Sequence, residues 1–100
     1  MAAKTNFEYD PEKNRGNLKK HGIDFVEAQV LWNGSHVIIP AKNVIGEKRF
    51  AILGRVRQKV YAAIFTKRVK SIRIISCRRA NKKWEKIFYE CLQKENNKEE

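Results

Sequence analysis

The side chains of this sequence best suited to chemistry are a histidine, a glutamate and several arginines. Cleaving a phosphodiester without a metal requires a proton acceptor, a proton donor and positive charge beside the phosphate. Histidine is the residue type best suited to carry a proton at neutral pH, so His21 is one candidate, and Glu47 is a second because it is one of only two acids in a strongly basic segment. We predict His21, Glu47, Arg49 and Arg73 as the catalytic set. The alternatives are a helix cap for His21 and a structural ion pair for Glu47.

A second set of cations is predicted to hold the phosphates of a polyanion. Arginine offers planar donors that suit two phosphate oxygens at once. Two lysines seven residues apart fall on one face of a helix and could flank the ligand. The predicted set is Lys13, Lys20, Arg68, Arg78 and Arg79. Each could equally be a solvated surface charge.

The charge distribution favours nucleic acid as the partner. Residues 42–86 carry fifteen basic and two acidic side chains, within a chain of net charge +11. Each Lys or Arg that meets a phosphate releases condensed counterions, so such a segment attracts RNA or DNA. No apolar run approaches the roughly 18 residues of a membrane span, and the first ten residues lack a secretory signal, so we expect a cytoplasmic protein.

Cysteine usage argues against a metal site or a disulfide framework. Cys77 and Cys91 are the two cysteines, and they form no C-x-x-C pair. Both are expected to be reduced thiols. The sequence therefore predicts no metal and no cofactor.

The first third of the chain predicts a short strand and two helices. The strand is Phe7-Glu8-Tyr9, and Asp10-Pro11 begins a polar helix that runs to His21. Gly22 stops that helix. A second helix is predicted from Asp24, with a capping box, to Gly34.

The remainder predicts antiparallel strands followed by one amphipathic helix. The expected strands are 36–40, 49–57, 60–66 and 72–79, and Gly54 indicates a bulge or a close backbone approach. Asn81 is predicted to cap the final helix. We expect one α+β domain over residues 1–100, with its core at about 7–93. Its helices would cover one face of the sheet and leave the other face, lined with arginines, for a ligand.

Several motifs, in this order, resemble the BrnT toxin family. The resemblance spans about residues 7–90. Its opening residues are Phe7-Glu8-Tyr9-Asp10, Lys13-Asn14, Asn17, Lys20-His21-Gly22, Phe25 and Glu27-Ala28. Its later residues are Gly46-Glu47-Lys48-Arg49-Phe50, Gly54, Thr66, Arg68, Arg73-Ile74-Ile75-Ser76, Arg78-Arg79-Ala80 and Tyr89-Glu90.

The resemblance implies a RelE-like α+β ribonuclease toxin of a type II toxin-antitoxin system. It implies an RNA substrate and neutralisation by a BrnA-type antitoxin in a hetero-oligomer, with promoter DNA bound only through the antitoxin. Two departures from the family pattern stand out. The loop 41–45 lacks the usual acidic residues, and Cys77 replaces a commoner Ala.

Two other classes of function remain open from the sequence. A non-catalytic RNA- or DNA-binding module would use the arginines but not His21 or Glu47. A domain that docks an acidic protein would form a tight complex with little salt-dependent affinity for RNA.

Overall fold

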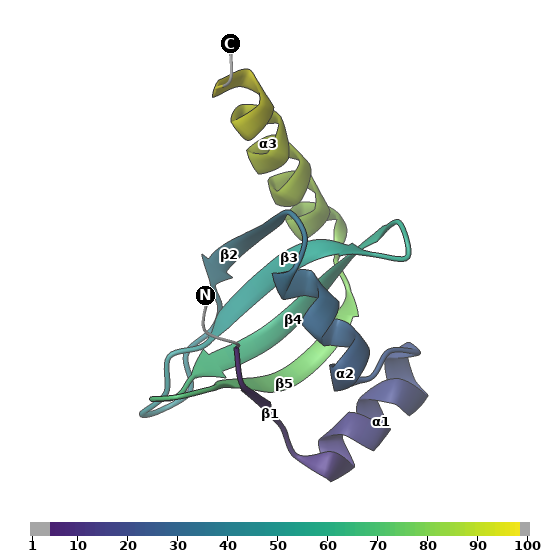
Figure 1. Ribbon diagram of the computed structural model, residues 1–100, viewed down its shortest axis with the longest axis vertical. Coiled ribbons are helices and arrows are strands. Elements are labelled where there is room, and N and C mark those ends of the chain that lie inside the picture. Colours follow the sequence, from purple (N-terminus) through teal and green to yellow (C-terminus); the bar gives the residue numbers. More distant parts are fainter. Residues whose placement is uncertain (1–4, 99–100) are drawn as a thin grey trace.

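The computed structural model describes residues 5–98 and forms a five-stranded sheet with helices on both faces (Figure 1). Its elements are β1 (Phe7–Glu8), α1 (Pro11–His21), α2 (Phe25–Ala28), the 3-10 helix η1 (Gln29–Trp32), β2 (His36–Pro40), β3 (Phe50–Val56), β4 (Lys59–Lys67), β5 (Ile72–Arg79) and α3 (Lys82–Lys98). The predicted α+β class is confirmed. None of the helices in the described part is long and apolar enough to cross a membrane.

The strand order in the sheet is β1-β5-β4-β3-β2. Strands β2 to β5 pair as an antiparallel meander, as predicted. The short β1 adds to the edge of β5 in parallel, with Phe7 beside Ile72 and Glu8 beside Arg73. The parallel pairing places β1 beside the turn between β4 and β5, where the Asn6 side chain donates to the Lys70 carbonyl.

Helices cover both faces of the sheet, so the expectation of one free, arginine-lined face is wrong. One core cluster lies under α2 and η1 and includes Phe25, Leu31 and Phe65. A second cluster lies under α3 and includes Leu53 and Phe88. In Figure 1 α2 crosses in front of the strands and α3 passes behind them. Coverage of both faces could have been predicted from the sequence, because β3 and β4 are nearly continuous apolar runs, which are typical of strands buried on both faces.

A bulge in β5 interrupts the regular alternation of side chains along that strand. Ile64 pairs with Ser76 while Phe65 pairs with Ile74, so Ile75 is an extra residue. Ile74 and Cys77 therefore point into the same core, although strict alternation places them on opposite faces.

The predicted boundaries of α1 are confirmed by its caps. The Asp10 carboxylate accepts from the Glu12 backbone amide, Pro11 is the first helical residue, and Gly22 ends the helix with φ 73°. The second helix begins at the Asp24 cap as predicted, but it tightens into η1 and ends at Trp32 rather than running on to Gly34. Gly54 serves a close approach: a Cβ there would lie 3.0 Å from a Leu31 methyl carbon.

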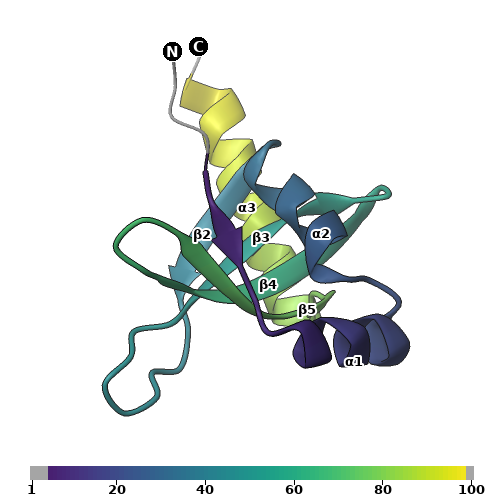
Figure 2. The same cartoon turned by 60° about the horizontal axis from the view of Figure 1, so that its bottom comes forward.

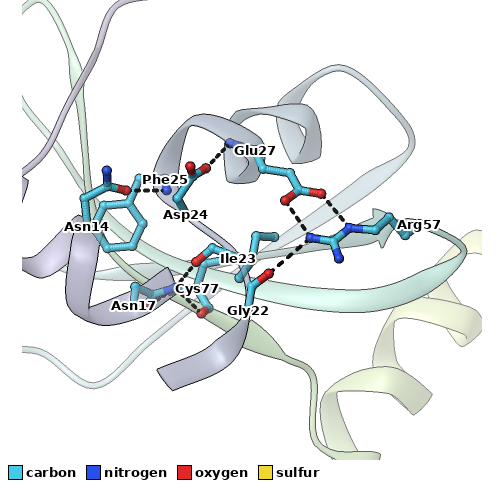
Figure 3. Close-up of polar contacts among 9 residues, drawn as sticks. All are labelled: Asn14, Asn17, Gly22, Ile23, Asp24, Phe25, Glu27, Arg57 and Cys77. Carbon is cyan, nitrogen blue, oxygen red and sulfur yellow. Dashed lines mark hydrogen bonds and ion pairs between the residues drawn. The ribbon is translucent and has the colours of Figure 1, made fainter. Parts of the chain in front are cut away.

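The Asn17 side chain makes hydrogen bonds to the backbone at the open edge of β5, as a neighbouring strand would (Figure 3). Its side-chain NH2 donates to the carbonyls of Ile23 and Cys77, both at 2.8 Å, and its Oδ1 accepts from the Cys77 amide at 3.1 Å. The side chain is 8% exposed. It fastens α1 and the following loop to the sheet, a role that no local sequence pattern predicts because its partner Cys77 lies 60 residues away.

Beside this network, Arg57 clamps the turn between β3 and β4 to the loop after α1. Its guanidinium donates to both carboxylate oxygens of Glu27 and to the Gly22 carbonyl (Figure 3). Arg57 and Gln58 form the turn with positive φ of 51° and 68°.

Candidate active site

Glu47 is held between two arginines at one end of the sheet. Its Oε1 accepts from Arg49 Nε at 3.0 Å, and its Oε2 accepts from Arg68 at 3.4 Å. Glu47 comes from the β2–β3 loop and Arg68 from the β4–β5 turn, and the two segments project on the same side in Figure 2. The structure therefore brings together three of the predicted site residues.

Arg73 lies at the same end of the sheet, paired with Glu8. Glu8 Oε2 accepts from Arg73 at 2.9 Å, and its Oε1 accepts from the Ser71 hydroxyl at 2.5 Å. These two hydrogen bonds hold the pKa of Glu8 below its ordinary value of 4.5, and the charges of Arg73 and Arg68 lower it further. Glu8 could not be identified as a site residue from the sequence, because its contacts depend on the parallel pairing of β1 with β5.

An open depression of about 320 Å³ lies beside Glu47. Its lining residues are Gly46, Glu47, Lys48, Phe50, Thr66, Lys67 and Arg68. The Thr66 hydroxyl donates to the Lys48 carbonyl at 2.8 Å and ties β4 to the loop. Fully exposed apolar residues lie at the two tips beside it, Ile45 on the loop and Val69 on the turn. Cations outnumber carboxylates here, and the depression can admit an anionic strand.

His21 is not part of this cluster. It ends α1 next to Gly22, whose carbonyl accepts from Arg57 in the β3–β4 turn. That turn precedes β4, whereas Arg68 follows it, and nine residues of strand span roughly 26 Å. A shared proton-transfer site requires contact at about 3 Å. The structure thus separates His21 from Glu47.

The other predicted RNA-binding residues are also spread out. Lys13 and Lys20 are exposed on α1. Arg78 and Arg79 are exposed at the end of β5 that pairs with the start of β4, away from Arg68. The guanidinium of Arg79 lies 5.9 Å from the centre of the Tyr61 ring. These four cations can contribute positive charge, but they do not line the depression.

Neither cysteine joins the cluster. Both are free thiols, and burial raises the pKa of the Cys77 thiol to about 12, so it stays protonated at neutral pH. Within residues 5–98 no three His, Cys, Asp or Glu side chains come together in a group that could hold a metal ion.

Comparison with known proteins identifies the family. Residues 9–83 match the family model described as the ribonuclease toxin, BrnT, of a type II toxin-antitoxin system. No curated protein sequence matches the chain. The crystal structure of the Brucella abortus ribonuclease toxin, BrnT, aligns with a TM-score of 0.63 and 24% identity, covering 79% of this chain and 100% of that one, which shows a common fold. The resemblance found in the sequence is confirmed, and since the family model spans more than half of its length, the chain belongs to the BrnT family of type II ribonuclease toxins.

Proposed function

We propose that this protein cleaves RNA endonucleolytically at the Glu47 cluster without a metal ion. The observation that carries the proposal is the carboxylate of Glu47 held between Arg49 and Arg68 at the edge of an open depression. Arg73 supplies further positive charge at the same end of the sheet. The combination offers a base and a phosphate clamp in one place.

In the proposed reaction Glu47 accepts the proton of the 2′-hydroxyl, and the 2′-oxygen attacks phosphorus. The arginines stabilise the charge that develops on the phosphorane. The bond to the 5′-oxygen then breaks, and that oxygen takes a proton from water in the open depression. The products are a 2′,3′-cyclic phosphate and a 5′-hydroxyl end. His21 takes no part in this scheme, because it lies too far from Glu47.

The test is cleavage of an end-labelled RNA in EDTA, with the product ends identified. The wild-type protein is expected to cut and to leave a cyclic phosphate, and a substrate with a 2′-deoxy nucleotide at the cut position should resist. Glu47→Gln should lose roughly 10²- to 10⁴-fold in rate while still binding RNA. Cleavage that requires added metal, or that proceeds on the 2′-deoxy substrate, would refute the proposal.

We also propose that a BrnA-type antitoxin neutralises the protein in the cytoplasm by covering this cluster. Support comes from the family, whose description places it in toxin-antitoxin systems, and from the fully exposed Ile45 and Val69 beside the depression. Exposed apolar side chains at a polar site suit a protein partner. Promoter DNA would then be bound through the antitoxin in the hetero-oligomer.

The antitoxin proposal has its own test. Ile45→Asp and Val69→Asp should each weaken the purified complex at least tenfold, measured by calorimetry. Val26→Asp is the matched control, because Val26 is also an exposed apolar residue but lies on another surface, on α2. Equal loss of affinity in all three variants would contradict the proposed location.

A further inference from the structure

A second group of cations lies at the opposite end of the sheet from Glu47, where β5 ends and α3 begins. The group comes from three elements and is exposed throughout: Arg55 on β3, Arg78 on β5, and Lys82, Lys83 and Lys86 on α3. Arg78 pairs with Ala62, which belongs to the core under α3, so Arg78 projects on the α3 side of the sheet. We call these five residues the second basic surface.

The second basic surface differs from the Glu47 cluster in how its charges are held. In the Glu47 cluster Arg49, Arg68 and Arg73 each pair with a carboxylate. Among residues 5–98, no ion pair includes any member of the second basic surface. Arg55 instead lies over the Phe88 ring, 5.8 Å from its centre. A ring orients a guanidinium without neutralising it, and leaves its donors free for an external anion.

The lysines of this surface also oppose the stability of their own helix. The first turns of a helix favour negative charge, because the backbone dipole places positive charge at that end. Lys82 and Lys83 occupy the first turn of α3, and Lys86 follows in the second. Glu85 is the one carboxylate among residues 82–89, and it forms no ion pair with these lysines. Positive side chains that gain nothing within the fold are suited to binding an anion outside it.

We propose that the second basic surface binds the RNA backbone at a distance from the cleavage site. The inference rests on the proposed ribonuclease function and narrows its substrate class. The two ends of β4 are roughly 26 Å apart, a distance that takes about eight nucleotides of a strand stacked in a helix at roughly 3.4 Å each, and fewer nucleotides of an extended strand. The preferred substrate is therefore an RNA long enough to reach both places, and a shorter oligonucleotide occupies the Glu47 cluster alone.

The first test compares affinity and stability in one variant. Lys82→Gln/Lys83→Gln/Lys86→Gln should bind an RNA of about 20 nucleotides on the order of a hundredfold more weakly at 0.1 M salt, and the slope of log K against log salt should fall by about 2. Its melting temperature should be unchanged or raised by roughly 2–5 °C, because the helix loses unfavourable charges. Lys94→Gln, exposed further along the same helix, is the matched control and should change neither. Unaltered affinity for the long RNA in the triple variant would overturn the inference.

The second test varies RNA length. The triple variant should bind an oligonucleotide of about three nucleotides as the wild type does, because that RNA is too short to span both places even when it is extended. Equal weakening for both lengths would overturn the inference, as would a variant that keeps its RNA affinity but loses the antitoxin. Binding needs no turnover, so a wild-type protein that shows this length dependence and never cuts would refute the ribonuclease proposal alone.

Discussion

Replacement of Asn17 by alanine tests whether the hydrogen bonds of this one side chain hold α1 against the edge of β5. The substitution removes three buried hydrogen bonds, two donated to the carbonyls of Ile23 and Cys77 and one accepted from the Cys77 amide. It leaves those three backbone groups without their partners in a buried part of the fold. It also releases α1 from the edge of β5.

The expected cost follows from the number of groups left unpaired. An unsatisfied buried donor or acceptor costs about 1–3 kcal/mol, so three give at least about 3 kcal/mol. The better helix propensity of alanine returns roughly 0.5 kcal/mol. We expect Asn17→Ala to lower the free energy of unfolding by at least about 2.5 kcal/mol, a large part of the roughly 5–15 kcal/mol that holds a small domain.

Urea denaturation followed by tryptophan fluorescence measures this loss. Asn14→Ala is the control, because the Asn14 side chain in the same helix makes one such bond, accepting from the Phe25 amide at 2.6 Å. The free energy of unfolding of this control should fall by about 1 kcal/mol. If Asn17→Ala lowers the free energy of unfolding no more than Asn14→Ala does, at an unchanged m-value, the proposed role of Asn17 at the edge of β5 is refuted.

Three further predictions follow from polar and strained sites. Because the folded pKa of Glu8 is lowered, its contribution to stability is present above the unfolded value of 4.5 and is lost as pH falls through the folded pKa. The stability difference between wild type and Glu8→Gln, measured by urea titration, should vanish in that acid range, and a constant difference would contradict the ion pair. Native protein should react with iodoacetamide at Cys91 and spare Cys77 until unfolding, as read by mass spectrometry; early labelling of Cys77 would count against its burial. Gln58→Gly should raise the free energy of unfolding by up to about 1 kcal/mol, since glycine tolerates its φ of 68°, and a loss would show that the turn is unstrained.

Local chemistry made both boundaries of α1 and the start of α3 predictable from the sequence. The Asp10-Pro11 start and Gly22 stop of α1 depend on neighbouring residues alone, and so does the Asn81 cap, whose Oδ1 accepts from the Trp84 amide at 2.8 Å. The meander of β2 to β5 was predictable for the same reason, because its connections are short. Family membership was predictable because the motifs lie in order along the chain.

Features that depend on contacts between distant segments were not predictable. The pairing of Glu8 with Arg73 joins residues 65 positions apart, and the bulge at Ile75 reverses the faces of the residues after it. Part of the candidate site was found, since Glu47, Arg49 and Arg68 do meet. His21 was chosen because histidine suits proton transfer and because it ends a polar helix, and no sequence pattern shows that α1 ends at the opposite end of the sheet.

The central claim is that Glu47, and not His21, is the base that acts on RNA. The most direct measurement is the single-turnover rate of cleavage of one labelled RNA in EDTA by the wild type, Glu47→Gln and His21→Ala, with the affinity of each protein for RNA determined in parallel. The account predicts that Glu47→Gln loses roughly 10²- to 10⁴-fold in rate at unchanged affinity while His21→Ala stays within a few-fold of the wild type. The reverse pattern, in which His21→Ala abolishes cleavage and Glu47→Gln retains it, would contradict the account.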